Sequence, residues 1–544
     1  MADPFAVTNQ APPLRGVNFF TQDAALGDAL RPYAASAEDL TDDPGLHRIG
    51  ELAGSAEALA HALPANQNPP VLRTHDRYGN RIDEVDFHPS WHWLMEQAVG
   101  FGLQAAPWTS DRPTPHLRRA AGFYVWSQVE PGHGCPISMS YAAVPALQAD
   151  DRLAKEWVPQ LASTQYDGRR LPAAEKLGVL AGMGMTEKQG GSDVRANLTT
   201  ATPAGDVYLL DGHKWFCSAP QVDVFLVLAQ APDGLSCFVV PRVLADGNRN
   251  PFALQRLKDK LGNRSNASSE VEFHGTVGYR LGAEGAGVRT IIEMVAATRL
   301  DCVLGSSALQ RRALVEAVWH ARHRSAFGGL LADKPAMQNV LADLAIESEA
   351  ATALGMRLAA AVDAARTGDA REAAFRRIAL PLAKFWVCKR TPFMVAEALE
   401  CLGGNGYVEE SGLPLLYRES PLNSIWEGSG NVNALDVLRA LRKPESLDAW
   451  LTELAAVQGA DARLDAAVND VLQALADAEN AEAGARRLAA RMALCLQASL
   501  LTRHSTPAVA DAFVASRLAG DWGGVFGTLP RTTPFEQILE RTIG

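Results

Sequence analysis

The spacing of apolar residues divides the chain into helical and extended stretches. Between Pro89 and Leu161 apolar side chains recur at steps of three and four, as in Trp91, Leu94 and Met95, which is the period of an α-helix. From about Val179 the pattern changes to short β-branched or aromatic runs, such as VYLLDGHKWF, VDVFLVLAQ and SCFVVPRVL, separated by Gly, Pro, Asp and Asn. Runs of this kind between turn residues predict an antiparallel sheet.

The helical period returns at about Gly287 and continues through Ala440, and Pro444 then interrupts it. The last hundred residues are rich in Ala and Leu and are predicted to be mostly helical. The first 65 residues are interpreted as an extension, helical only around residues 50–63. We therefore predict an α+β protein with four parts: an extension and helical domain (1–180), a middle β-domain (181–286), a helical bundle (287–444) and an extra helical unit (445–544).

Composition and charge narrow the class of protein. A chain of 544 residues with 47% apolar and 21% charged residues is typical of a globular protein of several domains. The net charge of −11 argues against a protein that wraps nucleic acid with its whole surface. The start MADPFAVTNQ lacks the basic and apolar segments of a signal peptide, and no apolar run reaches the length of a membrane span, so neither is expected.

The sequence predicts neither disulfide bonds nor a metal site. The seven cysteines are scattered, odd in number and never spaced CxxC, which favours reduced thiols in a cytoplasmic protein. His88 and His92 have the i, i+4 spacing of metal ligands but no neighbouring carboxylate or third ligand, so we predict no metal site. The nucleotide-binding, hydrolase and metalloprotease signatures GxxxxGK[ST], GxGxxG, GxSxG and HExxH are also absent.

A glycine-rich segment, GMGMTEKQGGSDV, precedes the predicted sheet at 182–194. Gly190 and Gly191 permit close approach of a ligand to the backbone, and Thr186 and Ser192 offer hydroxyl groups. A plain turn is the alternative interpretation.

Further along, GHKWFCSAP begins at Gly212. Its aromatic pair, Trp215 and Phe216, could form a wall of a pocket for a flat heterocycle, although such a pair alone is more typical of core. Arg324, in RSAFG, carries a fork of donors suited to a pyrophosphate, although a lone arginine is more often a surface residue.

One carboxylate is a candidate general base. Glu427 follows Trp426 in the segment NSIWEGSGN, on a loop before a helix whose start is marked by Ser429 and Asn431. A carboxylate against an aromatic ring is partly desolvated, which raises its pKa toward the range useful for a general base near neutral pH. An ordinary exposed glutamate is the alternative.

Taken in order, these segments resemble the acyl-CoA dehydrogenase family, which uses FAD. The matching blocks are TExxxGSD, GxKxWF with the following Ser, RxxFG, a downstream Gln with LAD, LGGNGY and WEGSGN, and they run from about Gly182 to Leu441. The segment KDKLGNRSNASSEVEF at 258–273, the extension and the extra C-terminal unit are similar to the AidB-like branch of that family. Lys188 and Gln189 depart from the Pro-Gly that is usual in the first block.

The resemblance implies a function for individual residues. Glu427 matches the catalytic base, and Arg299 resembles a residue that contacts the carrier of the thioester substrate. Phe216 takes the place of the tryptophan that stacks on the flavin, and Ser218 that of a threonine near flavin N5. Arg324 and Gln338 match residues that reach the adenine–pyrophosphate half of FAD in a neighbouring subunit. The full implied FAD set is Met185, Thr186, Gly191, Ser192, Phe216, Ser218, Arg324, Phe327, Gln338, Gly403, Gly404, Ser429 and Asn431.

The resemblance also implies a reaction, the α,β-dehydrogenation of a short or branched acyl-CoA by a cytoplasmic homotetramer. A thioester α-proton becomes acidic once its carbonyl is polarised, here by a ribityl hydroxyl and the Glu427 backbone N–H. Glu427 then removes that proton while a hydride leaves the β-carbon for the flavin. The electron acceptor that reoxidises the flavin stays open. A flavoenzyme that oxidises nitroalkanes or amines is a weaker alternative.

Another alternative is a flavin-containing protein that binds and protects duplex DNA after alkylation, with marginal dehydrogenase turnover. The branch is associated with DNA through its C-terminal unit, yet from Ser446 onward eight Arg and no Lys face twelve Asp and Glu. Counterion release requires clustered cations. The candidate DNA contacts are Arg439, Arg486, Arg487 and Arg491, which equally fit a solvated helix face.

Overall fold

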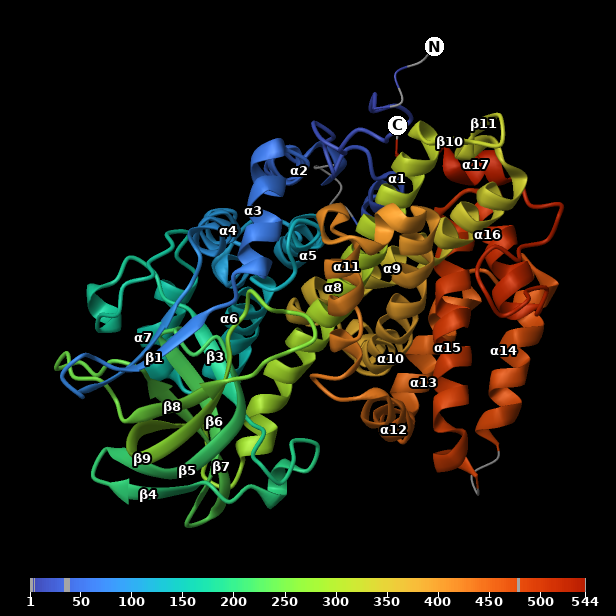
Figure 1. The fold of residues 1–544 in the computed structure, drawn as a ribbon. Coiled ribbons are helices and arrows are strands. Elements are labelled where there is room, and N and C mark those ends of the chain that lie inside the picture. Colours follow the sequence, from blue (N-terminus) through green and yellow to red (C-terminus); the bar gives the residue numbers. More distant parts are fainter. Residues whose placement is uncertain (1–2, 4, 34–39, 477–479, 544) are drawn as a thin grey trace. The chain divides into compact units, whose positions relative to one another are not determined.

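The structure, a computed structural model, describes residues 3, 5–33, 40–476 and 480–543. These residues form two compact units (Figure 1). The first comprises the described residues of 1–57, 116–129 and 302–544, and the second comprises 58–115 and 130–301. Helices build the first unit, and helices and a sheet build the second, as the predicted α+β class requires.

The second unit is organised around a seven-stranded sheet. Its path β3–β6–β4–β5–β9–β7 returns to β6, so the sheet closes into a barrel, and β8 pairs with β9. The β6–β7, β4–β5, β5–β9, β7–β9 and β8–β9 pairs are antiparallel, as predicted, whereas β3 joins β6 in parallel. The strands are β3 (Ala181–Gly184), β4 (Thr200–Ala204), β5 (Val207–Ser218), β6 (Val224–Ala231), β7 (Gly234–Pro241), β8 (Phe252–Leu257) and β9 (Ser268–Leu281).

Burial explains the sequence of the barrel strands. In β6 and β7 nearly every side chain is buried, inward and outward alike, so VFLVLAQA and LSCFVVP read as continuous apolar runs. Helix α6 (Gly134–Leu147) packs against β3, where the Ala181 N–H donates to Ser140 Oγ at 2.9 Å. The other helices of this unit are most of α3 (Ala56–Gln67), α4 (Pro89–Gly100), α7 (Asp151–Leu161) and the first part of α8 (Gly287–His323).

A short hairpin, β1 (Val71–His75) with β2 (Arg81–Asp86), was not predicted from the sequence. Asp76 fixes its turn by accepting from the N–H groups of Tyr78 and Asn80. Asp83 joins the hairpin to β8, because its carboxylate accepts from the Leu254 N–H at 2.9 Å.

The first unit is a helical bundle in which α9, α10 and α15 pack side by side (Figure 1). Pro444, predicted to interrupt the helical run, is the first residue of α13, where its missing N–H has no cost. Within the described residues no helix is long and apolar enough to cross a membrane. The helices are α1 (Ala24–Leu30), α2 (Pro44–Ala53), nearly all of α5 (Pro115–Ser127), the end of α8, α9 (Pro335–Arg366), α10 (Ala370–Cys401), α11 (Leu413–Glu419), α12 (Gly430–Leu441), α13 (Pro444–Ala455), α14 (Ala462–Leu475), α15 (Ala481–His504), α16 (Pro507–Phe513) and α17 (Phe535–Leu539), and a short hairpin joins β10 (Ser325–Ala326) to β11 (Gly329–Leu330).

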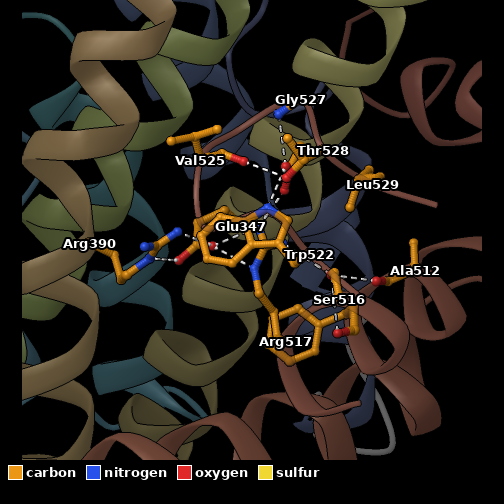
Figure 2. Close-up of polar contacts among 12 residues, drawn as sticks. Glu347, Arg390, Ala512, Ser516, Arg517, Trp522, Val525, Gly527, Thr528 and Leu529 are labelled. Carbon is orange, nitrogen blue, oxygen red and sulfur yellow. Dashed lines mark hydrogen bonds and ion pairs between the residues drawn. The ribbon is translucent and has the colours of Figure 1, made fainter. Parts of the chain in front are cut away.

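The C-terminal segment is fixed to this bundle by a buried, fully paired charge network (Figure 2). Arg517 contacts the carboxylates of Asp343 and Glu347, and Arg390 also binds Glu347, at 2.9 Å. The Trp522 indole N–H donates to Asp343 at 3.0 Å. Because every buried charge here has a partner of opposite sign, the network serves as a structural anchor.

Candidate cofactor and catalytic site

A buried carboxylate, Glu187, holds the glycine-rich loop of the second unit to the barrel. It accepts from the Lys214 ammonium at 2.6 Å, from Gln189 Nε2 at 2.8 Å, and from the N–H groups of Leu198 at 2.6 Å and Thr199 at 3.2 Å. The side chains of Glu187 and Lys214 have no exposed surface. Both ends of the loop are therefore tied to one point beneath it.

The Glu187–Lys214 pair is charged in the fold. Burial raises the pKa of Glu187, but the Lys214 ammonium and the hydrogen bonds outweigh it and lower the pKa to about 2. Burial also lowers the pKa of Lys214, against the pull of Glu187. Both residues lie within sequence motifs, but the motifs predict no role for either of them. The available signal was an inward position for Lys214 in the alternating strand VYLLDGHKWF.

The same loop brings together four of the predicted cofactor residues. A Cβ on Gly191 would lie 2.3 Å from Thr186 Oγ1, so glycine is required for the loop to fold back on Thr186. Met185, Thr186 and Gly191 are half-buried and Ser192 is exposed. Gly190 has a φ of +146° with open space around it, which leaves bare backbone at the surface.

An irregularity in β5 turns two aromatic rings outward. The pairing of β5 with β9 shifts register between Lys214 and Cys217, and the two residues between them leave the barrel core. Phe216 is 52% exposed, so the core interpretation of the aromatic pair is wrong for this residue. Lys258 Nζ lies 3.3 Å from the centre of the Trp215 ring and 4.7 Å from that of Phe216.

These groups suit a planar heterocycle with polar edges. Phe216 offers an exposed ring, and Thr186 and Ser192 offer hydroxyl groups. Ser218 Oγ, at the end of β5, lies 3.3 Å from Ser268 Oγ, and a hydroxyl pair of this kind can both donate and accept. Arg299, the predicted substrate contact, belongs to the same unit, on the first part of α8.

The predicted base lies in the first unit on a loop with a buried lysine beneath it. Glu427 has a φ of +57°, the left-handed region that non-glycine residues adopt rarely and mostly under functional constraint. Lys384, on α10, is 1% exposed. Its ammonium donates to the carbonyl oxygens of Asn423 at 2.5 Å, Trp426 at 2.8 Å and Gly428 at 3.0 Å. One side chain therefore holds the backbone on both sides of Glu427.

Further hydrogen bonds fix the rest of this loop. Asn433 Nδ2 donates to the carbonyls of Gly428 at 2.6 Å and Ser429 at 3.1 Å, and the Trp426 indole donates to Asn423 Oδ1 at 2.8 Å. The Glu427 side chain is half-buried. Ser429 and Asn431 are exposed, where α12 begins.

A third group of predicted residues lies in the first unit, before and at the start of α9 and in the turn after α10. Phe327 is 92% exposed, and Gln338 is half-buried on the first turn of α9. Gly403 and Gly404 are exposed in a short helical turn (Gly403–Tyr407), and each has open space where a Cβ would lie.

Two residues of the N-terminal extension connect this third group. Arg324 donates to the carbonyl of Asn9, whose side chain in turn donates to the carbonyl of Ser325 at 2.8 Å. Asn405 Nδ2 donates to Gln10 Oε1 at 3.3 Å. The sequence did not predict this role of the extension, because the segment NQAPP contains no motif that indicates a binding site.

Comparison with known proteins identifies the family. Family profiles match for the AidB N-terminal domain at residues 9–168, the acyl-CoA dehydrogenase middle domain at 182–276 and its C-terminal domain at 285–442. The chain is 47% identical to AidB of Escherichia coli (strain K12) over 511 residues, 93% of each protein. The chain belongs to the acyl-CoA dehydrogenase family. Within it, these matches assign the chain to the AidB branch, as the sequence motifs predict.

More distant members of the acyl-CoA dehydrogenase family agree. Acyl-CoA dehydrogenase family member 11 of Caenorhabditis elegans is 30% identical over 449 residues, 79% of this chain and 72% of that protein. The crystal structure of Caenorhabditis elegans ACDH-11 in complex with C11-CoA aligns with a TM-score of 0.85 at 26% identity, covering 100% of this chain and 93% of that one. The predicted fold is confirmed, and membership makes the chain an FAD-dependent oxidoreductase.

The candidate DNA-binding arginines are partly engaged inside the first unit. Arg491 pairs with Asp470 at 3.3 Å. Arg486 reaches Asn431 Oδ1 at 3.4 Å and lies over the Phe385 ring, while Arg487 and Arg439 are exposed. The four candidate arginines are thus only partly available to a phosphate backbone.

Proposed function

We propose that this protein catalyses the α,β-dehydrogenation of an acyl-CoA thioester, with Glu427 as the catalytic base. The observation that carries the proposal is the Glu427 loop, which adopts a left-handed backbone over the buried ammonium of Lys384. A costly backbone conformation persists where surrounding contacts enforce it, and such places cluster at active sites.

Lys384 has a proposed role in polarising the substrate. The Trp426 carbonyl and the Glu427 N–H belong to one peptide unit, so the hydrogen bond from Lys384 to that carbonyl, at 2.8 Å, makes the N–H a stronger donor. That N–H is the group expected to bind the thioester carbonyl and to acidify the α-proton. The Glu427 carboxylate accepts this proton.

In the second unit, we propose that the glycine-rich loop and the outward face of β5 hold FAD. Thr186, Ser192 and Ser218 would bind polar edges of the flavin, and Phe216 would cover its ring. In the first unit, Arg324, Gln338 and the Gly403–Gly404 backbone would bind the adenine–pyrophosphate half of the FAD that a neighbouring subunit holds. Bound FAD supplies the two-electron acceptor for the hydride that leaves the substrate β-carbon.

The acyl-CoA class draws support from the ACDH-11 structure, which holds C11-CoA. For this chain we propose a short or branched acyl group. The experiment is anaerobic mixing of the yellow protein with a panel of straight, branched and C11 acyl-CoAs, followed by the loss of flavin absorbance. Bleaching by thioesters and none by nitroalkanes supports the proposal, while the reverse selects a nitroalkane-oxidising flavoenzyme.

We further propose a homotetramer in the cytoplasm. The exposed aromatic side chains beside the third group, Phe327 at 92% and Tyr407 at 82%, suit contact with a neighbouring copy. None of the seven cysteines, all of which the structure describes, forms a disulfide, which suits a reducing compartment. Light scattering of the FAD-bound protein tests the assembly, since a monomer at micromolar concentration contradicts it.

Duplex binding is the second function that the branch suggests, and no contact among the described residues favours it. Arg491 has a carboxylate partner, which reduces the positive charge available for phosphate. Salt-dependent shifts of duplex DNA, lost when Arg486, Arg487 and Arg491 are changed together, would establish it.

A further inference from the structure

A recess in the second unit carries charges that the proposed reaction does not use. It measures roughly 330 Å³, counted with the solvent at its mouth. It lies between α7, the segment 168–173, the segment before β6 and the segment after β7. Its polar side chains are those of Arg170, Gln221, Asp223 and Arg242.

Arg242 is buried without a carboxylate partner. The residue is 6% exposed, and its guanidinium lies over the Phe252 ring at 4.2 Å from the centre. One nitrogen, Nη2, makes a long contact of 3.4 Å with the Asp83 carbonyl, while Nε and Nη1 are buried with no hydrogen-bond partner. These two donors leave the guanidinium in different directions, and each can give one hydrogen bond to an acceptor oxygen in the recess.

Two further groups in the recess point to the same kind of ligand. The amide nitrogen and oxygen of Gln221 are both buried and have no partner, so this side chain offers an unused donor. Arg170 also lines the recess, and among the described residues it forms no ion pair. Burial, and after it the positive charge of Arg170, lowers the pKa of Arg242 to about 9, against the opposing effect of the Asp83 carboxylate.

The nearby carboxylates do not supply the missing negative charge, because each is already engaged. Asp223 binds Lys176 and the Leu180 N–H. Asp83 binds Arg81 at 2.9 Å, and Glu84 binds both Arg73 and Arg249. Arg517 also has a buried side chain, but unlike Arg242 it contacts two carboxylates.

We propose that this recess is a binding site for a small oxyanion, held by the two free N–H groups of Arg242 with Arg170 and the Gln221 amide. Phosphate and carboxylate share the required chemistry, namely a planar or tetrahedral group with two acceptor oxygens. Trp157 is the one aromatic residue among those that line the recess, so a nucleotide base would have no second ring to stack against. None of the residues proposed to bind FAD lines the recess, so the inference does not depend on the proposed reaction.

The test is a titration of the FAD-bound full-length protein with inorganic phosphate, sulfate, acetate and malonate, at ionic strength held constant with sodium chloride. We expect a saturable rise in Tm with at least one oxyanion, because a ligand that binds only the folded state stabilises it. The oxyanion whose effect saturates at the lowest concentration shows whether the natural ligand carries a phosphate-like or a carboxylate group.

The matched variants are Arg242→Met, Gln221→Leu and, as an exposed control on the hairpin turn, Arg77→Gln. Arg242→Met should lose the response entirely, and its ligand-free Tm should equal or exceed that of the wild type because a buried unpaired charge is gone. Gln221→Leu is the milder change and should weaken oxyanion binding about tenfold. If Arg242→Met fails to fold, this variant still tests the proposal. Arg77→Gln should respond as the wild type does. An equal response to chloride, or an unchanged response in Gln221→Leu, would overturn the proposal.

Discussion

Two buried lysines lie beneath the two loops that carry the proposed chemistry, and they differ in what they bind. Lys214 in the second unit ends on the Glu187 carboxylate at 2.6 Å. Lys384 in the first unit donates to three backbone carbonyls and forms no ion pair with any residue that the structure describes. The first charge is neutralised, whereas the second acts on the peptide groups around Glu427.

The difference separates two uses of a buried cation. A neutralised pair fixes the shape of a loop and adds little electric field outside itself. An ammonium bonded only to carbonyls polarises those peptide units in a medium of low dielectric constant. We infer that Lys214 sets the geometry of the cofactor loop, and that Lys384 sets both the geometry and the donor strength of the base loop.

Replacing Lys384 should have the larger effect on chemistry. In Lys384→Met, we expect the rate of flavin reduction by acyl-CoA to fall about 10²- to 10³-fold, as when an oxyanion donor is removed. FAD affinity should change little. Rapid mixing under anaerobic conditions measures the rate, and exposed Lys443→Met is the control. A rate within twofold of the wild type would show that Lys384 has no part in catalysis.

Replacing Lys214 should instead affect stability and cofactor binding. Lys214→Met leaves Glu187 buried and uncompensated, which should destabilise the fold by about 3–5 kcal/mol and weaken FAD binding. The double variant Lys214→Met with Glu187→Gln should recover much of that loss. Urea unfolding and FAD titration measure the two effects. Strictly additive losses in the double variant would contradict a coupled pair.

The pair also predicts an acid dependence. Because the fold lowers the pKa of Glu187 to about 2, the unfolded chain takes up protons first as the pH falls. The stability from this pair should be complete above about pH 4.5 and be lost as the pH falls toward 2. Unfolding curves of the wild type and Glu187→Gln should therefore converge in acid. A constant difference between them at all pH values would rule out this linkage.

The smallest effect should come from the loop glycine. In Gly191→Ala the added methyl collides with Thr186 Oγ1, so we expect FAD affinity to fall about tenfold, at a cost of about 1–3 kcal/mol. Gly484→Ala, a helical position with open space, is the control and should be neutral or slightly stabilising. Equal FAD affinity in the two variants would mean that the loop adapts to the methyl group.

The sequence predicts elements well because periodicity and turn residues are local signals. The antiparallel strand pairs, the helical stretches and the interruption near Pro444 follow from such signals, and the structure confirms them. The assigned site residues and the four domain boundaries stay predictions, because local signals alone do not determine ligand contacts or the limits of a domain.

What the sequence did not predict depends on which distant segments meet. Lys384 stands in an apolar helical run and gains its role only because residues 423–428 fold over it. Asn9 is unremarkable until its carbonyl meets Arg324. Arg242 reads as the residue after a strand, and only the packed surroundings show that its donors lack partners. None of these contacts has a local sequence signal.

The central claim is that Glu427 removes a substrate proton. Its most direct test is the anaerobic rate of flavin bleaching by the best acyl-CoA of the panel, in the wild type, in Glu427→Gln and in the exposed control Glu410→Gln. We predict bleaching that is at least about 10³-fold slower in Glu427→Gln, with unchanged flavin content, and a normal rate in Glu410→Gln. A Glu427→Gln protein that bleaches at the rate of the wild type would contradict the account.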